Sequence, residues 1–582
     1  MDKNQKIAFM IIGVILIGYS LIFKPEASSE EGENSADTTV TVTNPEAKTD
    51  SITPINPVID SSKTVATTEK TYLVETEELK ITFSSIGGKI KAVELKNFKT
   101  HDSLPLILFD ELSAQLEVNI NNNTLASQNF TSTLSDKNTV SEDELIAIFS
   151  GNGITQTYTI PSKGFQIKYK INGVKGSSAS YNWTESYKQV EEDLTLSYQK
   201  SGINYYTTEG EFDDYGTGKS DEDLETIEGK IKWISNKQRF FSSAIIADQN
   251  IQNLNVKSNV KGCTEGTFKK VKSTFKIPAV NGQVAYTYYF GPNDYDILKE
   301  VTEGFKRNIT LGWGIFRWMN EGVVIPIFKF LTTYISNYGL AILALVFIIK
   351  MLLLPIAYRS YLSMAKMKEL KPELDALKAK HGDDQMASQQ SSMALYKEVG
   401  VNPMAGCIPP LLQMPVLLAL FQFFPNWFAF RQEAFLFAHD LSTSDRIITF
   451  PAIFGGFDHI SIFTLLMTLS TLAYTYYNNK FTSSAQMQGP MKTMTYLMPL
   501  VFFFMLNSYS AGLTFYYFVS NIITIAQQNI ATRFIDKDKI RQKMDENKKN
   551  RKDGTAKKSI TERFADKARQ KMDEVEQNNK KR

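Results

Sequence analysis

Five apolar stretches occupy the second half of the chain, and they constrain its fold more than any other feature. They are residues 337–358, 405–428, 460–477, 491–506 and 511–530. Each is near the length that a helix needs to cross about 30 Å of hydrocarbon, although the fourth would require tilt or local thinning of the bilayer. The sequence therefore predicts a multi-domain membrane protein with a five-helix core over residues 336–533.

Another apolar run, residues 7–23, follows a short polar start that contains Lys3 and Lys6. Basic residues in this position keep the N-terminus in the cytoplasm. No small-residue cleavage pattern follows the run, so residues 1–24 are predicted to be an uncleaved signal anchor. A cleaved signal peptide is the alternative. With the anchor, the predicted number of transmembrane α-helices is six.

Two regions separate the anchor from the core. Residues 25–68 are rich in Ser, Thr, Glu, Asn and Pro and have few large apolar residues, which is typical of a disordered linker. Residues 69–300 contain short β-prone runs such as 155–160 and 285–290, several of which alternate apolar and polar residues. This pattern predicts one large all-β sandwich domain, which would be periplasmic because it follows the anchor.

Residues 301–335 are predicted to form an amphipathic helix in the membrane interface. Apolar side chains recur there at roughly helical spacing, at Ile315, Phe316, Trp318, Met319, Val323, Ile327, Phe330 and Leu331. Charged residues lie between them, among them Arg317, Glu321 and Lys329. An ordinary helix packed on the β domain is the alternative.

The distribution of charge predicts which loops face the cytoplasm. The loop 359–403 contains seven Lys and Arg residues and the tail 534–582 is basic, whereas acidic residues offset the arginines of the loop 431–458. The positive-inside rule therefore places the first loop and both termini in the cytoplasm. Within 359–403, two helical patterns separated by a turn predict a cytoplasmic helical hairpin.

The C-terminal tail combines basic charge with an internal repeat. From residue 531 to the end, 18 Lys and Arg residues accompany 10 Asp and Glu residues. Residues 538–546 recur in imperfect form at 566–574, an offset of 28 residues. Such a tail predicts an acidic partner, either anionic lipid or nucleic acid. A solvated run of charges is the alternative.

Lys350 is the strongest candidate for a functional residue. It lies 8 residues before Tyr358, inside the first apolar stretch, which is roughly 12 Å along a helix. A charge at that depth costs on the order of 2.5–3.5 kcal/mol on insertion scales, so Lys350 is predicted to face a polar cavity. Partial snorkelling of its side chain to the headgroups is the alternative.

Polar residues in other stretches can line such a cavity. The candidates are Gln413, Tyr516, Tyr517, Ser520, Asn521, Thr524 and Gln528. Tyr517, Asn521, Thr524 and Gln528 are spaced to share one helical face. Gln527 of the last stretch and Thr468, Ser470 and Thr471 of the third are further polar residues. Polar groups facing lipid are penalised, so all these side chains are predicted to point inward. Hydrogen bonding between helices is the alternative for about half of them.

Several other functions find little support in the sequence. No carboxylate lies deep in the five stretches, which disfavours a proton-coupled transporter. No phosphate-binding, serine-hydrolase or zinc-protease motif occurs, and the two cysteines and four histidines are scattered, so no enzyme, metal site or cofactor is predicted. A hydrolase in the β domain, built on a predicted loop, is a much weaker alternative. Its carboxylates would be Glu209, Glu211, Asp213 and Asp214.

Six motifs in the second half carry a family resemblance. They are residues 361–367, 394–397, 401–407, 412–416, 494–499 and 512–521. In this order they resemble the YidC/Oxa/Alb family of membrane insertases, in its Gram-negative form. The β domain is similar to that family's periplasmic β-supersandwich, mainly around Gly87 and Gly88. The family's groove charge is usually Arg and here is Lys350, which keeps the charge without the guanidinium fork.

The resemblance implies an insertase and chaperone that inserts inner-membrane proteins and helps them fold, alone or with the Sec translocon. Its site would be a hydrophilic, positively charged groove open to the cytoplasm and to lipid, in which Tyr516 and Tyr517 touch substrate. The hairpin would present Met364, Met367, Leu370 and Tyr396. The implied partners are nascent membrane proteins, the Sec translocon, the ribosome through the basic tail, and the phospholipid bilayer, but not DNA.

Overall fold

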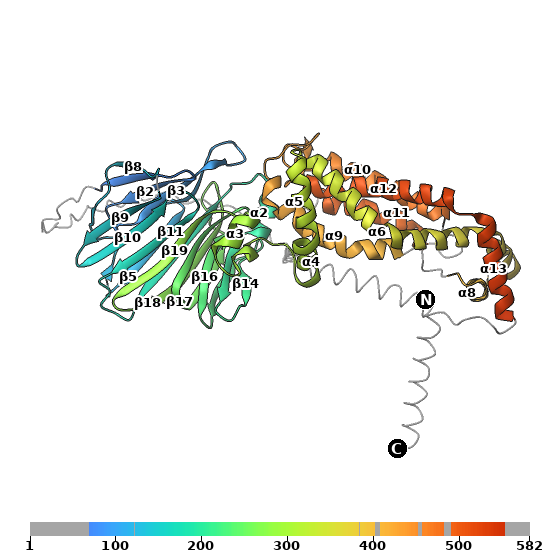
Figure 1. Ribbon diagram of the computed structural model, residues 1–582, viewed down its shortest axis with the longest axis horizontal. Coiled ribbons are helices and arrows are strands. Elements are labelled where there is room, and N and C mark those ends of the chain that lie inside the picture. The colour runs from blue at the N-terminus through green and yellow to red at the C-terminus, as the bar shows by residue number, and fades with distance from the viewer. Residues whose placement is uncertain are drawn as a thin grey trace, which may run out of the picture.

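The computed structural model describes residues 69–121, 123–141, 143–382, 384–401, 408–451, 457–481 and 490–552 (Figure 1). A β domain lies at one end of this elongated molecule and a helical domain at the other (Figure 1). The predicted anchor, the predicted linker and the second copy of the tail repeat lie outside the described residues.

The first sheet of the β domain has five strands in the order β4-β3-β2-β1-β8. They are β1 (Thr71–Glu75), β2 (Leu79–Ser84), β3 (Ile90–Lys99), β4 (Pro105–Asp110) and β8 (Lys137–Thr139). Neighbours pair antiparallel, except that β8 pairs parallel with β1.

The second sheet has fourteen strands, with the main order β6-β5-β12-β18-β17-β19-β11-β10-β9-β7. The long strand β17 also pairs with β15 and β16, and β13 joins β16 to β14. The bounds are β5 (Ala114–Ile120), β6 (Asn123–Thr124), β7 (Thr131–Ser132), β9 (Glu144–Gly151), β10 (Ile154–Pro161), β11 (Gln166–Asn172), β12 (Ser178–Lys188), β13 (Gly202–Thr207), β14 (Phe212–Tyr215), β15 (Glu222–Ile227), β16 (Ile231–Lys237), β17 (Phe241–Asn259), β18 (Thr267–Pro278) and β19 (Gln283–Pro292).

The two sheets enclose an aromatic core. Along β12 every second residue is buried, which is the two-residue period of a strand with one face inward. Phe83 of the first sheet contacts Tyr158 of the second with ring centroids 4.9 Å apart, and Phe109 contacts Phe290 at 5.6 Å. The structure therefore confirms the predicted large β-sandwich.

Short helices connect the two domains. They are α3 (Tyr295–Val301), a 3₁₀ turn (Phe305–Asn308), α4 (Gly314–Met319), a π-helical turn (Asn320–Val324) and α5 (Ile325–Tyr334). Another short helix, α2 (Leu194–Lys200), lies within the β domain between β12 and β13. Asn320 is buried, and its amide donates to the carbonyl oxygens of Leu311 and Ala419 at 2.9 and 2.7 Å. Around α4 and α5, Trp313, Ile315, Trp318, Phe330 and Tyr334 are exposed.

Five longer helices build the helical domain. They are α6 (Tyr338–Glu369), α9 (Ile408–Asn426), α10 (Ile462–Phe481), α11 (Pro490–Leu506) and α12 (Ala511–Phe534). A 3₁₀ turn (Phe428–Phe430) and the hairpin of β20 (Arg446–Thr449) and β21 (His459–Ser461) connect α9 to α10. Of the described helices, α6 alone is both long and apolar enough to span a membrane by length and composition. Met494–Leu506 is a shorter apolar helix, and the count of six membrane helices remains a prediction.

Helix α6 continues past residue 358 to Glu369, so the first part of the loop 359–403 extends this helix. The rest forms a helical hairpin of α7 (Lys371–His381) and α8 (Gln385–Val399). The chain after α12 forms α13 (Lys537–Lys552), which lies beside the hairpin at the far end of the molecule (Figure 1).

Candidate functional site

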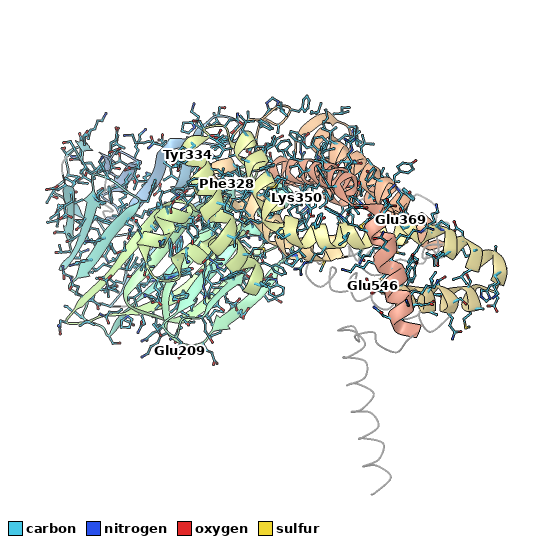
Figure 2. The ribbon with its side chains drawn as sticks, turned by 45° about the vertical axis from the view of Figure 1, so that its right-hand side comes forward. Glu209, Phe328, Tyr334, Lys350, Glu369 and Glu546 are labelled. Carbon is cyan, nitrogen blue, oxygen red and sulfur yellow. The ribbon has the colours of Figure 1, made fainter. Side chains whose placement is uncertain are left out.

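Lys350 lies on α6 and is buried among three helices of the helical domain, where Figure 2 labels it. Lys350 is only 5% exposed. The ammonium donates to Oε1 of Gln413 on α9 at 2.8 Å and to Oγ1 of Thr524 on α12 at 2.7 Å. Three helices that are distant in sequence therefore meet at one positive charge.

The acceptors around Lys350 are themselves held in place. The Gln413 amide donates to Oγ of Ser520 at 2.9 Å, and the Thr524 hydroxyl donates to the Ser520 carbonyl at 2.7 Å. These residues, Lys350, Gln413, Ser520 and Thr524, are called the Lys350 cluster below. The Gln527 amide lies 3.4 Å from the Lys350 carbonyl oxygen, at its edge.

The Lys350 cluster contains a charge without a counter-charge. Among the residues that the structure describes, no carboxylate forms an ion pair with Lys350. Removing an ammonium from water is costly, and neutral acceptors repay only part of that cost. An anion that reached this site would therefore gain a strong partner.

The structure separates the other predicted groove residues from Lys350. Asn521 donates to Oγ of Ser470 at 3.0 Å and to Oγ1 of Thr471 at 2.8 Å, so it connects α12 to α10. Gln528 is buried, with its amide 3.9 Å from the Met364 sulfur. These are contacts of the kind that the alternative of hydrogen bonding between helices predicts, and a place for either residue in the groove stays a prediction.

Tyr516 and Tyr517 belong to neither group. Tyr516 is buried, and its ring packs against Phe424 with centroids 5.8 Å apart. Tyr517 is partly buried and meets the Tyr516 ring edge-on at 6.0 Å. Contact of either ring with substrate remains a prediction.

Three further polar residues take part in these contacts, and the sequence predicted of them only that they point inward. Gln527 falls one position outside the polar stripe of α12, so counting by helical spacing passes over its contact with Lys350. Ser470 and Thr471 are polar residues of the third apolar stretch, and only the tertiary structure shows that they bind Asn521.

The predicted hairpin residues divide between two apolar clusters. Met364 packs with Tyr361 and Ala531, beside the end of α12. Met367, Leu370 and Tyr396 belong to a second cluster, which also contains Ile540 and Met544 of α13. The hairpin is thus joined to the tail helix by an apolar contact.

Two buried arginines, Arg239 and Arg431, form hydrogen bonds or an ion pair between the β domain and the helical domain. Nε and Nη2 of Arg239 donate to the Pro425 carbonyl at 3.0 and 2.8 Å, and Nη2 also donates to the Ser442 carbonyl at 2.6 Å. Arg431 of the helical domain pairs with Glu191 of the β domain, with Nε and Oε1 2.7 Å apart and both side chains buried. Burial raises the pKa of Glu191, and Arg431 opposes that shift.

Two lysines lie at the same junction without a carboxylate ion pair in the described structure. Lys237 is 3% exposed, and its ammonium is 3.3 Å from Oγ1 of Thr310. Lys200 donates to Oε1 of Gln422 at 3.1 Å. Burial lowers the pKa of Lys237 to about 7, with the Lys200 charge adding to the effect, and burial lowers the pKa of Lys200 to about 8.

The carboxylates considered for a hydrolase do not form an enclosed site. Glu209, Glu211, Asp213 and Asp214 are exposed on the hairpin of β13 and β14. The sequence predicts a loop for these residues, but in the structure Asp213 and Asp214 lie on strand β14. Figure 2 labels Glu209 on the β domain, far from Lys350.

Comparisons with known proteins agree with this architecture. A family model described as "60Kd inner membrane protein" matches residues 330–539, and "YidC periplasmic domain" matches residues 71–326. The chain is 39% identical to "Membrane protein insertase YidC" of Amoebophilus asiaticus, over 96% of this chain and 97% of that one. The protein of the same name from Cytophaga hutchinsonii is 37% identical, over 93% and 92%.

Among solved structures, one described as "Active YidC insertase crystal structure with the first transmembrane domain resolved" covers 81% of this chain and 93% of its own. Its sequence is 19% identical and the TM-score is 0.33. The two family models together cover most of the chain, and the relatives match it over nearly their whole length. The chain belongs to the YidC family of membrane protein insertases.

Proposed function

We propose that this insertase uses the Lys350 cluster to receive the polar, acidic part of a membrane protein that must cross the bilayer. The observation that carries the proposal is a buried ammonium whose bonded partners, Gln413 and Thr524, are both neutral. A carboxylate of the client would supply a negative charge to pair with this ammonium.

The physical advantage lies in the barrier that the client meets. A polar segment loses its hydration in hydrocarbon, and a fixed charge among polar side chains replaces part of that hydration. Coulombic attraction is stronger there than in water, because the effective dielectric constant is lower. The apolar segment of the client then enters lipid through the hydrophobic effect, so this route requires no nucleotide.

The proposed topology places this cluster within a membrane core. The anchor and helices α6, α9, α10, α11 and α12 would make six crossings, with both termini and the hairpin α7–α8 in the cytoplasm. The lysines and arginine of the loop 359–403 support this orientation. The groove would open toward the cytoplasm and lipid, and the exposed aromatic residues near α4 and α5 would lie in the interface.

The proposed partners follow from charge and family. The basic tail supports docking of a ribosome, whose RNA is a polyanion. Cooperation with the Sec translocon is proposed from the family resemblance alone. Truncation after Arg533 should abolish salt-sensitive co-sedimentation with ribosomes, and retained co-sedimentation would transfer that role to the hairpin.

The test is insertion by the purified full-length protein in liposomes. A single-spanning client with an acidic translocated tail is synthesised beside them, and protease protection of the tail is measured. Lys350→Leu should reduce the initial rate about tenfold, the effect of roughly 1.4 kcal/mol on a barrier, while Lys350→Arg should retain most of it. A client whose acidic residues are replaced by Asn and Gln is the matched control. Equal rates for all three proteins with the acidic client would contradict the proposal.

A further inference from the structure

Helix α13 packs on the hairpin through two apolar residues. Ile540 and Met544 are each only 5% exposed, although α13 is otherwise strongly polar. They are one helical turn apart and therefore share a face. Their apolar cluster contains Met367 and Leu370 from the end of α6, Leu374 from α7, and Leu395, Tyr396 and Val399 from α8.

Polar contacts fix the position of α13 along the hairpin. The Asn547 amide donates to the carbonyl oxygen of Val399, the last residue of α8, at 3.1 Å. The Lys548 ammonium is 3.6 Å from Oε2 of Glu373 on α7. Helix α13 therefore touches both helices of the hairpin.

Helix α13 is basic, with eight Lys and Arg residues and three Asp and Glu residues between Lys537 and Lys552. From residue 536 to 549 the exposed basic side chains are Lys537, Lys539, Arg541, Lys543 and Lys549. The exposed acidic side chains over the same residues are Asp536, Asp538, Asp545 and Glu546. The apolar pair of this first copy of the repeat is Ile540 and Met544, and the second copy has Ala568 and Met572 at the same positions.

Docking and helix formation of α13 are coupled. A polar helix of 16 residues is marginal in water when it stands alone, so α13 depends on its packing for stability. Release from the hairpin would therefore fray α13.

The position of α13 in the chain gives this contact a mechanical role. Helix α12 contributes Ser520 and Thr524 to the Lys350 cluster and leads directly to α13, while α6 carries Lys350 and leads directly to the hairpin. The contact between α13 and the hairpin therefore ties together the ends of the two helices that carry most of the cluster. We propose that α13 is an intramolecular clasp that holds the hairpin α7–α8 in place and frees it on release.

The consequence for insertion rests on the function proposed above. A hairpin held by the clasp stays at the ends of α6 and α12, and a freed hairpin uncovers that end of the core. Release of α13 would then control how readily a client reaches the Lys350 cluster. The clasp itself is a structural statement that can be tested without any client.

The test is hydrogen–deuterium exchange on the full-length protein in lipid nanodiscs. Ile540→Ser combined with Met544→Ser should speed amide exchange at least about tenfold in α13, α7 and α8. Met572→Ser is the matched control, because Met572 occupies the position of Met544 in the second copy of the repeat and should leave the hairpin unchanged. Unchanged exchange in α7 and α8 of the double variant would overturn the clasp, as would equal acceleration by Met572→Ser.

A covalent bridge gives the opposite manipulation. Glu373→Cys and Lys548→Cys, with Cys263 and Cys407 replaced by Ser, should be joined by a short bifunctional reagent, because their side chains meet in the structure. Bridging should restore slow exchange in the Ile540→Ser and Met544→Ser background, and failure to restore it would count against the clasp. If the bridged protein with Ile540 and Met544 intact inserts clients at the rate of the same protein before bridging, the link between clasp and client access is wrong. If the unmodified protein inserts no client at all, the proposed function fails, while the exchange result still decides the clasp.

Discussion

Two buried arginines at the junction between the domains differ in their partners from Lys350 in the helical domain. At the junction between the domains, Arg431 pairs with Glu191, and Arg239 donates to the carbonyl oxygens of Pro425 and Ser442. In the helical domain, the acceptors of Lys350 among the residues that the structure describes are the neutral Gln413 and Thr524. The arginines hold the two domains together, whereas the proposed function makes the charge of Lys350 available to a ligand. Lys237 and Lys200 at the junction also form no carboxylate ion pair in the described structure, and burial lowers their pKa values.

Among substitutions of these residues, we expect the largest loss of stability at the junction between the domains. Arg431→Met should destabilise the folded protein by about 3–5 kcal/mol, because Glu191 would remain buried without its partner. Unfolding of the full-length protein in detergent by denaturant measures this change. The double variant with Glu191→Gln is the control and should recover much of the loss. A loss below about 1 kcal/mol in Arg431→Met would place this pair among weak surface ion pairs.

The two junction lysines predict a dependence of stability on pH. Burial lowers the pKa of Lys237 from 10.5 to about 7, beside Lys200, Lys269, Arg239 and Asp214. The folded state therefore favours the neutral amine, and the resulting penalty is complete below pH 7 and shrinks as the pH rises toward 10.5. Stability should increase with pH over this window, with a slope of at most about 1.4 kcal/mol per pH unit from this group.

Denaturant unfolding at several pH values between 7 and 10 tests that dependence. Lys237→Met should remove its share of the slope, since methionine fills similar space without a titrating group. An identical slope in Lys237→Met and wild type would show that other groups produce it.

Asn521 should have a smaller effect. Asn521→Ala removes the hydrogen bonds to Ser470 and Thr471 between α12 and α10 and should cost about 1 kcal/mol of stability. Its insertion rates for acidic and neutral clients should fall equally or not at all, which a parallel assay of both clients measures. A selective loss with acidic clients would place Asn521 in the functional site with Lys350.

Lys350 should have the smallest effect on stability. Lys350→Met removes a costly buried charge but leaves acceptors on Gln413 and Thr524 without a donor, each costing on the order of 1–3 kcal/mol. These opposing changes should leave the free energy of unfolding within about 1 kcal/mol of wild type. A loss like that of Arg431→Met would show that Lys350 is a structural cation and would remove the contrast between the two regions.

The sequence predicted the features that show a regular spacing of apolar residues, or in which one residue carries a large free-energy cost in its surroundings. Alternating residues in the strands predicted the β-sandwich, and a single charge in an apolar stretch identified Lys350. Helical spacing alone could not divide the polar face of α12 between two neighbours, so Thr524 and Asn521 were assigned to one lining although they contact α6 and α10 respectively.

The junction could not be predicted, because its partners are far apart in the chain and ordinary in composition. Arg431 and Glu191 are separated by 240 residues, and nothing in their neighbours distinguishes them from surface charges. The same holds for α13, whose residues Ile540 and Met544 stand in a highly charged segment. Only the fold brings these groups together.

The most direct test of the contrast reverses the charge at Lys350. Lys350→Glu and wild type are compared in liposomes with two clients that differ only in the sign of the charges on the translocated tail. If the uncompensated charge selects the client, wild type should insert the acidic tail faster, and Lys350→Glu should favour the basic tail. Equal loss of insertion for both clients would show that the charge of Lys350 does not choose the client, and would contradict the account.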